Sequence, residues 1–343
     1  MANLFFLLSG EHATLPAQEI KAILEAEGHS FQILENLDQT LRIEADIKCI
    51  ETVKNRAAFT KLCALELFNC KAEAKEIIKA LCSTSLSILH KEENFAVRIK
   101  HVKNHSAKIN SMDLERKLGE ILNKATKAKV NLKNPDKIMI GILTDKKFIF
   151  GLKLAEIPSK PFVERRPKRR PFFHPSAMPP KLARCMVNLA KPKTGELVFD
   201  PFCGTGSMLI EAALMGCRIL GLDVQRRMVK GTIKNLEYFN ITPEGVIVAD
   251  ARNPPVSRVD CAVADPPYGR SSTTLRRTTA EIVEEFLTSA REMLDRKRRV
   301  CIAAPKNLNV GQLGLTLGYK HLESHFVYVH RSLTREIAVF EKV

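Results

Sequence analysis

The second half of the sequence predicts an α/β fold built on a doubly wound, mostly parallel sheet. From Lys181 onward, apolar segments alternate strictly with helical segments, and the apolar segments are short. Such strands are typical of a parallel sheet that helices cover on both faces. The predicted elements are helix Lys181–Leu189, strand Leu197–Phe199, helix Ser207–Met215, strand Arg218–Leu222, helix Arg227–Phe239, strands Gly245–Ala249 and Val259–Ala264, helix Thr279–Leu294, strand Arg299–Ala303 and a terminal antiparallel hairpin of Ser324–His330 and Glu336–Phe340.

The first half predicts two small α+β domains, residues 1–60 and 61–155. With 343 residues, of which 45% are hydrophobic, the chain is long enough for two or three packed domains. Pro16 suits a first helical turn, and Gly28 suits a left-handed helix end. The predicted elements are strand Asn3–Leu8, helix Pro16–Glu27, strands Ser30–Leu34 and Leu41–Glu44, helices Ile47–Arg56, 72–82 and 113–124, and strands Phe95–Lys100, Ile138–Thr144 and Phe148–Leu154.

A basic, proline-rich segment separates these domains from the α/β half. Six prolines occur at positions 158, 161, 167, 171, 175 and 179, among the basic residues Lys160, Arg165, Arg166, Lys168, Arg169 and Arg170. Proline at this density opposes a continuous helix and favours an extended chain. We therefore predict a linker over residues 156–175 and a catalytic domain over residues 176–343.

The charge of the chain predicts a polyanionic partner. Lys and Arg number 54 against 38 Asp and Glu, which gives a net charge of +16, and residues 61–150 alone hold 18 basic and 10 acidic side chains. Nucleic acid is the usual partner of such a protein. No apolar run is long enough to span a membrane, and the nine cysteines form no CxxC pair. We expect a cytoplasmic protein with reduced thiols and no metal site.

The loop after the first strand of the α/β half is the first candidate site. It reads Asp200-Pro201-Phe202-Cys203-Gly204-Thr205-Gly206-Ser207, and its glycines allow close approach of a ligand to the backbone. It lacks the third glycine of a dinucleotide fingerprint and the GK[ST] of a phosphate-binding loop. An acidic residue at the start of the loop suits a cation, and S-adenosylmethionine carries both a sulfonium and an α-amino group.

Aspartates end the next two strands as well. Asp223 follows the second strand, where a carboxylate can accept the hydroxyl groups of a ribose. Asp250-Ala251 follows the third strand, where an acidic side chain can meet the amino group of an adenine. Each aspartate alone is as well explained by a solvated strand end, but three in register at successive strand ends indicate a nucleoside site.

The fourth strand ends in Asp265-Pro266-Pro267-Tyr268. Two prolines in a row fix the backbone, so that the Asp265 carboxylate and the Pro266 carbonyl form a pair of acceptors. This pair can hold both N–H groups of an exocyclic amine, and Tyr268 offers a stacking face for the base. An ionised Asp265 would stabilise the positive charge that develops on the amine nitrogen during methyl transfer.

Together these motifs resemble the class I S-adenosylmethionine-dependent methyltransferases, and DPPY resembles the signature of those that methylate an amino nitrogen. The resemblance covers residues 172–343 and implies the strand order 3-2-1-4-5-7-6 with an antiparallel last strand. It assigns Asp200, Gly204 and Gly206 to the methionine part, Asp223 to the ribose and Asp250 to the adenine. We also expect the neighbouring cofactor contacts to include Phe202, Thr205 and Ala251.

A closer resemblance extends over nearly the whole chain. The strings RPFFHP (170–175), MPPKLAR (178–184), DPFCGTGS (200–207), LIEAALMG (209–216) and DPPYGRSS (265–272) resemble the archaeal tRNA guanosine-10 N2-methyltransferases. The resemblance implies a ferredoxin-like domain over 1–60, a THUMP domain over 61–155 that binds the tRNA 3′ end, and cofactor contacts from His174 and Pro175. It also implies a target guanosine turned out of its stem. We expect a monomer.

Three alternatives stay open at this stage. A methyltransferase of another tRNA guanosine, such as position 6, would have the same domains. A DNA or protein amino-methyltransferase would also use a DPPY-type motif, although neither needs a THUMP-like domain. A non-catalytic RNA-binding protein would bind tRNA without binding S-adenosylmethionine.

Overall fold

The computed structural model describes residues 1–106, 108–267 and 278–343, and its chain divides into two compact units. Unit 1 comprises Met1–Ala17, His29–Lys54 and Phe59–Pro158. Unit 2 comprises Gln18–Gly28, Asn55–Ala58 and Ser159–Val343, and thus includes most of α1 (Leu15–Ala26). None of the helices in the described ranges is both long and apolar enough to cross a membrane.

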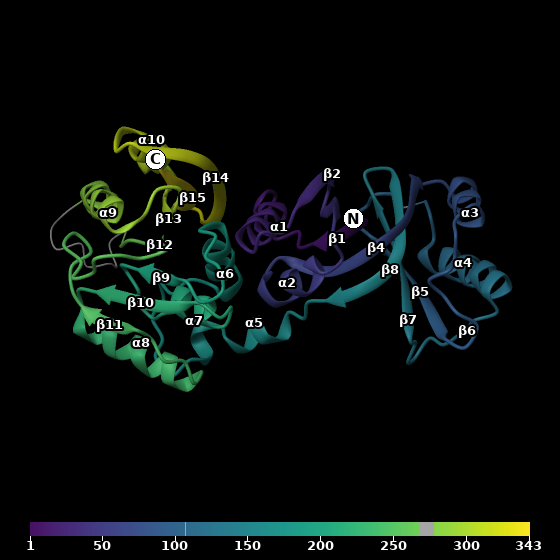
Figure 1. Ribbon diagram of the computed structural model, residues 1–343, viewed down its shortest axis with the longest axis horizontal. Coiled ribbons are helices and arrows are strands. Elements are labelled where there is room, and N and C mark those ends of the chain that lie inside the picture. Colours follow the sequence, from purple (N-terminus) through teal and green to yellow (C-terminus); the bar gives the residue numbers. More distant parts are fainter. Residues whose placement is uncertain (107, 268–277) are drawn as a thin grey trace. The chain divides into compact units, whose positions relative to one another are not determined.

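Unit 1 is built on one eight-stranded sheet with the order β2-β3-β1-β4-β8-β7-β5-β6 (Figure 1). All neighbouring strands pair antiparallel, except that β5 runs parallel to β6 and β7. The elements assigned to this part of the chain are β1 (Ala2–Leu8), β2 (Phe31–Leu37), β3 (Thr40–Ala45), α2 (Cys49–Arg56), β4 (Thr60–Lys71), α3 (Ala74–Cys82), β5 (Asn94–His101), α4 (Ser111–Thr126), β6 (Lys129–Val130), β7 (Lys137–Thr144) and β8 (Lys147–Glu156).

Helices α3 and α4 cover one face of the β5–β7–β8 part of the sheet. The apolar residues Leu118 and Leu122 of α4 pack into a cluster with Phe95, Phe148 and Phe150 of the strands. The helix begins where the Asn110 side chain accepts hydrogen bonds from two backbone amides, those of residues 112 and 113. The burial of apolar side chains and the N-terminal cap therefore both stabilise α4.

Strand β4 was missing from the sequence-based prediction, and it begins at the predicted boundary between residues 1–60 and 61–155. Thr60–Lys71 pairs with β1 on one side and with β8 on the other, so residues 1–60 and 61–155 share one continuous sheet. The sequence of β4, TKLCALELFNCK, contains Leu, Ala, Glu and Lys, which are not strong strand formers. Long-range pairing with two neighbours, rather than local propensity, makes it a strand.

Unit 2 contains a seven-stranded sheet with the order β11-β10-β9-β12-β13-β15-β14. Counted from β9, this is 3-2-1-4-5-7-6, and β15 runs antiparallel to β13. The strand order reverses between β9 and β12. The elements after Ser159 are α5 (Lys160–Glu164), η1 (Pro167–Arg169), α6 (Pro180–Leu189), β9 (Leu197–Asp200), α7 (Ser207–Ala213), β10 (Arg218–Asp223), α8 (Arg226–Tyr238), β11 (Gly245–Val248), β12 (Cys261–Ala264), α9 (Thr279–Met293), β13 (Arg299–Pro305), η2 (Lys306–Leu308), α10 (Val310–Thr316), β14 (Tyr319–His330) and β15 (Leu333–Lys342).

Helices cover both faces of this sheet, as the strand–helix alternation predicted. Phe286 and Leu287 of α9 pack against Leu222 and other apolar residues of the strands, and Val310 of α10 joins the same cluster. Helices α6, α7 and α8 contact the strands on the opposite face of the sheet. There, a Cβ on Gly221, which alternates with Leu222 along β10, would lie 2.6 Å from Leu209 of α7.

The segment 156–175 differs from the extended linker predicted for it. It contains the short helix α5 and the 3₁₀ turn η1, and from Ser159 onward it belongs to unit 2. Phe162 is buried, and Arg165 pairs with the fully buried Glu211 of α7, with Nε 2.8 Å from Oε1. The burial of Phe162 and the ion pair between Arg165 and Glu211 outweigh the preference of a proline-rich sequence for an extended chain.

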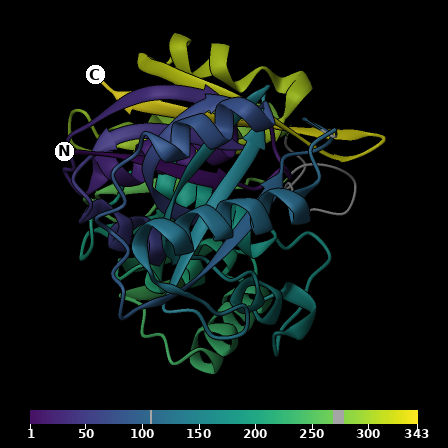
Figure 2. The same cartoon turned by 90° about the vertical axis from the view of Figure 1, so that its right-hand side faces the viewer.

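The C-terminal hairpin is longer than predicted. Strand β14 begins at Tyr319 rather than residue 324, and α10 before it was not predicted. Figure 2 shows β14 and β15 running side by side as a hairpin, in which Val327 is opposite Arg335. Tyr319 is buried, and its hydroxyl donates to the Leu287 carbonyl at 2.7 Å, which ties the start of β14 to α9.

Candidate active site

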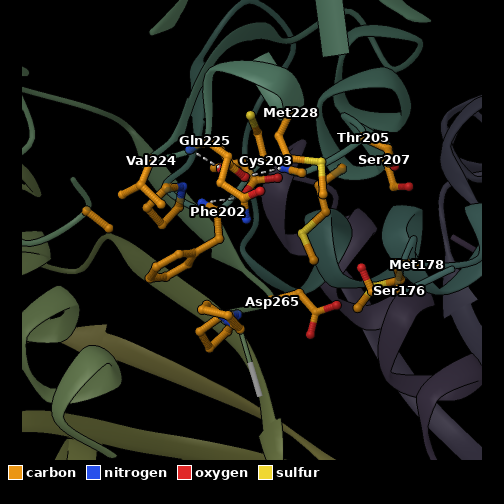
Figure 3. A pocket seen from close by; sticks show the side chains of 18 of the residues that line it. Ser176, Met178, Phe202, Cys203, Thr205, Ser207, Val224, Gln225, Met228 and Asp265 are labelled. Carbon is orange, nitrogen blue, oxygen red and sulfur yellow. Dashed lines mark hydrogen bonds between the residues drawn. The ribbon is translucent and has the colours of Figure 1, made fainter. Parts of the chain in front are cut away.

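The candidate site lies in unit 2 at the carboxyl ends of β9, β10 and β12, next to the point where the strand order reverses. Ligands of open α/β sheets bind at this edge because loops diverge there. A cavity of about 220 Å³ opens at this point (Figure 3). The predicted site residues that line it are His174, Asp200, Phe202, Gly204, Thr205, Asp223, Asp250, Ala251, Asp265, Pro266 and Pro267.

Two of the predicted site residues that the structure describes do not line the cavity. Pro175 lies between the lining residues His174 and Ser176 without lining the cavity itself. Gly206 has φ +77° at the N-terminal end of α7, and a Cβ there would lie 2.9 Å from Cγ2 of Thr232. Gly206 therefore shapes the loop through its backbone. Tyr268 lies outside the described residues.

The loop after β9 is held by hydrogen bonds at both ends. The Cys203 amide donates to the Leu222 carbonyl of β10 at 2.7 Å, and the Cys203 carbonyl accepts from the Gly206 amide at 2.7 Å. Thr232 of α8 donates its hydroxyl to the Gly204 carbonyl at 2.8 Å. Gly204 itself has φ +54°. These bonds present the backbone of Gly204 and Thr205 to the cavity in a fixed shape.

Asp223 at the end of β10 reaches back to this loop. Its Oδ2 accepts from the Gly204 amide at 3.1 Å, and its Oδ1 accepts from the Gln225 amide at 2.8 Å. Burial raises the pKa of Asp223, while these two hydrogen bonds and an electrostatic interaction with His174 oppose the rise. The carboxylate is thus oriented by two backbone donors, and it lines the cavity where a ligand hydroxyl can approach.

Asp200 at the end of β9 is the most deeply buried carboxyl group of the site, with 3% of its surface exposed. Its Oδ1 accepts from the Phe202 amide at 3.1 Å. Burial raises the pKa of Asp200 well above its usual value, and the negative charges of Asp265 and Asp223 raise it further. A ligand cation at this end of the cavity would relieve the cost of ionising Asp200.

Asp250, which follows β11, has an arginine partner within its own turn. Its Oδ1 accepts from the Arg252 amide at 3.0 Å, and its Oδ2 accepts from Arg252 Nε at 2.8 Å. Ala251 between them is buried and lines the cavity. The turn therefore offers a small apolar residue and a carboxylate whose charge Arg252 already balances.

The fourth strand places Asp265, Pro266 and Pro267 at the cavity wall. Asp265 follows the buried strand β12, and its Oδ2 lies 3.5 Å from Nη2 of Arg335 on β15. The Pro267 carbonyl accepts from the hydroxyl of Thr279, the first residue of α9, at 3.4 Å. Figure 3 shows the Asp265 side chain directed toward the cavity, opposite Met178 and Met228.

Hydroxyl groups occur near the N-terminal end of α7. The Thr205 hydroxyl is buried and has no hydrogen-bond partner among the described residues, and it lines the cavity. Ser207 Oγ accepts from Nη1 of the buried Arg170 at 2.8 Å. A buried hydroxyl without a partner fits a polar ligand that completes the site, and the cationic amino-acid end of S-adenosylmethionine is such a group.

Sequence reasoning missed several lining residues. They are Ser176, Ala177, Met178, Pro201, Cys203, Ser207, Met208, Val224, Gln225, Met228, Arg252, Ile282 and Arg335. Val224 and Gln225 directly follow Asp223, so the end of the second strand could have indicated them. The methionines carry no comparable signal, because an apolar residue usually packs into the core. Arg335 reaches the site only through the pairing of the hairpin.

This fold and this site define a class. The sheet has the strand order that the resemblance to class I S-adenosylmethionine-dependent methyltransferases implies, and its cavity is lined by Gly204 of the loop after β9 and by the acidic residues at three successive strand ends. A family model described as "RMKL-like, methyltransferase domain" matches residues 167–335. A second model, described as "DNA methylase", matches residues 69–235.

Comparison with curated proteins narrows the class to a family. The chain is 38% identical over 350 aligned residues to the tRNA (guanine(10)-N2)-dimethyltransferase of Methanothermobacter thermautotrophicus, which covers 99% of this chain and 100% of that protein. It is 30% identical to the enzyme of the same name from Methanocaldococcus jannaschii, over 98% of this chain and 99% of that protein. The chain belongs to the family of tRNA (guanine(10)-N2)-dimethyltransferases.

Solved structures agree on the fold. The structure of TrmN from Thermus thermophilus is similar over 99% of this chain and 100% of that chain, with a TM-score of 0.57 at 20% identity. SMU.472, described as a putative methyltransferase complexed with SAH, is similar over 100% of this chain with a TM-score of 0.58 at 14% identity. At these identities the likeness concerns the fold alone.

Proposed function

We propose that this protein transfers methyl groups from S-adenosyl-L-methionine to the exocyclic N2 of guanosine 10 in tRNA, forming N2-methylguanosine and then N2,N2-dimethylguanosine. The observation that carries the proposal is the Asp265-Pro266 corner, which lies in the same cavity as Asp200 and Asp223. Membership of a family whose curated members are tRNA (guanine(10)-N2)-dimethyltransferases supplies the target position and the second methylation.

The residues of the cavity are suited to hold S-adenosylmethionine. Asp200 and the Gly204 backbone would bind its amino-acid part, the Asp223 carboxylate its ribose hydroxyls, and the Asp250-Ala251 turn the edge of its adenine. The remaining proposed contacts are Phe202, Thr205, Gly206, His174 and Pro175. When bound, S-adenosylmethionine supplies an electrophilic methyl group on a sulfonium sulfur. The acidic lining suits this cation and would bind its neutral thioether product less strongly.

Asp265 and Pro266 would act on the target amine. The carboxylate and the carbonyl each accept one N–H of the guanine N2 group, which turns the nitrogen lone pair toward the methyl group. The nitrogen forms its bond to the methyl carbon as the carbon–sulfur bond breaks, and the negative charge of Asp265 stabilises the positive charge that develops on nitrogen. The methylated nitrogen then gives up one proton to the Asp265 carboxylate, which leaves neutral N2-methylguanosine. Pro267 fixes the turn, and Tyr268 would stack on the guanine ring. Positioning and charge stabilisation dominate, since a neutral thioether leaves without acid catalysis.

The first 155 residues would bind the tRNA. We infer that residues 1–60 form a ferredoxin-like domain and residues 61–155 a THUMP domain, although both share the sheet of unit 1. The surplus of basic side chains in residues 61–150 supports binding of the 3′ end of the tRNA by the second of these. The target base would turn out of its stem to reach the cavity. We expect the protein to act as a monomer in the cytoplasm.

Methyl transfer by an Asp265→Ala variant tests the proposal. With an unmodified tRNA transcript and labelled cofactor, we expect activity to fall by about 10²- to 10³-fold, the scale on which transition-state charge stabilisation acts. Affinities for cofactor and tRNA should stay within a few-fold of wild type. Turnover comparable to wild type would rule out the proposed role of Asp265. Transfer to DNA instead of tRNA would favour an amino-methyltransferase of DNA, the class that the second family model describes.

A further inference from the structure

Arg335 is a buried cation at the Asp265 corner that the mechanism above does not use. Its side chain is 10% exposed, and its Nη2 lies 3.5 Å from Oδ2 of Asp265, whose side chain is 17% exposed. Arg335 also lines the cavity. The Arg335 guanidinium therefore contacts the carboxylate that is proposed to bind the target amine.

The C-terminal hairpin sets the position of Arg335. On β15, Arg335 is opposite Pro305 of β13 and Val327 of β14. In a sheet, successive side chains point to opposite faces, so a slip of one residue would turn Arg335 away from Asp265. The antiparallel pairing therefore delivers a side chain from the end of the sequence to the carboxyl end of β12.

The charged groups around Asp265 are mainly acidic. Asp200 lies close enough that the charge of Asp265 raises its pKa, and Asp223 lies on the next strand end. Asp250 is paired with Arg252, and His174 faces Asp223. Among the described residues that line the cavity, Arg335 is the cation paired with Asp265. Without it, ionisation of Asp265 would add a negative charge beside two others in a largely buried site.

We propose that Arg335 is a positioning residue that keeps the Asp265 carboxylate ionised and fixes its orientation toward the target amine. A guanidinium suits this task, because it stays charged and its planar set of N–H groups fixes a carboxylate in orientation. The inference rests on the role proposed above for Asp265. It names Arg335 as the residue that keeps Asp265 negatively charged, which the role of Asp265 requires.

The dependence of kcat on pH in Arg335→Gln tests this inference. We expect kcat at pH 7 to fall about tenfold or more, and the acidic limb of the profile to move upward by about one pH unit or more, because Asp265 then ionises at higher pH. Arg335→Lys keeps the charge and should leave the acidic limb near its wild-type position. Arg331→Gln, in the exposed turn of the same hairpin, is the matched control and should behave as wild type.

A double variant separates the inference from the proposed function. Asp265→Asn should keep only residual activity, and adding Arg335→Gln to it should cause little further loss, because both changes remove one interaction. An Asp265→Asn enzyme as active as wild type would overturn the role of Asp265 itself. Residual activity in Asp265→Asn with an unmoved acidic limb in Arg335→Gln would overturn only the role of Arg335. A rise in KM for tRNA at unchanged kcat would also overturn it and make Arg335 an RNA contact. If Arg335→Gln does not fold, a displaced limb in Arg335→Lys contradicts the proposal.

Discussion

At the scale of single residues, the candidate site is a set of carboxyl groups whose ionisation depends on what surrounds them. Asp200 and Asp223 are turned toward the cavity by backbone donors, and burial raises the pKa of both. Asp250 and Asp265 instead have arginine partners. The two kinds of environment separate their roles. In the proposed function, Asp200 and Asp223 would meet a ligand cation and its hydroxyls, and Asp265, beside Arg335, would meet the amine.

Cofactor binding should release protons and become tighter as the pH rises. The raised pKa of Asp200 means that this carboxyl holds a proton in the free protein to higher pH than usual, and the ligand cation binds only the ionised form. Between the pKa of the bound state and that of the free state, the affinity should rise by up to about tenfold per pH unit for each proton released. Calorimetry of S-adenosylmethionine in two buffers of different ionisation enthalpy measures the release.

Asp200→Asn is the control for this linkage. This variant should bind S-adenosylmethionine more weakly, and its affinity should lose the dependence on pH that Asp200 contributes. If the affinity of Asp200→Asn depended on pH as strongly as that of wild type, the released proton would come from another group. If the wild-type affinity fell as the pH rose, the predicted release of protons would be wrong.

Asp223→Ala should weaken cofactor binding with a smaller effect on the chemical step. Hydrogen bonds to a charged group contribute about 1.5–3 kcal/mol each, so the Kd for S-adenosylhomocysteine should rise about 10- to 100-fold. Asp260→Ala is the matched control. Asp260 accepts from the Leu197 amide at 2.8 Å, but it precedes β12 at the opposite edge of the sheet. Equal effects of the two variants in calorimetry would mean that Asp223 acts through stability rather than through contact with ribose.

At the scale of elements, the loop after β9 and the helices beneath it fix the shape of the cavity. The loop depends on backbone angles that only some residues adopt, and the helices depend on a buried ion cluster. Glu211 of α7 is fully buried, and its two oxygens lie 2.8 Å from Nε of Arg165 and from Nε of Arg184. This cluster ties α6, α7 and the segment before them into one layer below the loop.

Gly206→Ala should destabilise the protein more than Gly195→Ala. Both glycines have positive φ, +77° and +85°, where a left-handed backbone costs alanine about 1–2 kcal/mol. Only at Gly206 would the new Cβ also meet a neighbour, Cγ2 of Thr232 at 2.9 Å, whereas nothing lies within 4 Å at Gly195. Urea unfolding gives both free energies of unfolding. Equal losses would show that Thr232 moves aside without cost.

Glu211→Ala should be strongly destabilising. It leaves the guanidinium groups of Arg165 and Arg184 buried without a counter-charge, and removing one partner of a buried ion pair costs about 3–5 kcal/mol. Glu164→Ala is the control, because Glu164 lies 3.9 Å from Lys160 and both side chains are exposed. Its loss in the same urea titration should stay below about 1 kcal/mol. A small effect of Glu211→Ala would mean that water or another anion reaches the two arginines.

At the scale of the whole molecule, the sequence predicted what depends on local pattern. Strand–helix alternation predicted the doubly wound sheet, and residues at strand ends such as Asp200, Asp223 and Asp265 were predicted to meet because parallel strands share an edge. Contacts that depend on pairing over long distances escaped prediction. Arg335 reaches Asp265 only through the hairpin register, and β4 is a strand only because β1 and β8 pair with it. The burial of Phe162 and the ion pair of Arg165 with Glu211 likewise differ from what the composition of the segment around them predicted.

The net charge of +16 leads to a prediction for the complete protein. Binding of tRNA should weaken by at least about tenfold between 0.05 and 0.2 M salt, the loss expected when about two or more phosphates are neutralised. Binding of S-adenosylhomocysteine, which lacks phosphates, should change little over the same range and serves as the control. Filter binding and calorimetry measure the two affinities. A tRNA affinity independent of salt would contradict an electrostatic RNA-binding surface.

The most direct test of the central claim is methylation of two tRNA transcripts that differ in one exocyclic amine. One carries guanosine at position 10 and the other inosine, which lacks the N2 amino group. With labelled S-adenosylmethionine and mapping of the modified nucleoside, we expect N2-methylated guanosine at position 10 of the first transcript and no label at that position in the second. Label at another atom or position of the guanosine transcript, or at the inosine, would contradict the claim that the Asp265 corner presents guanosine N2 for methylation.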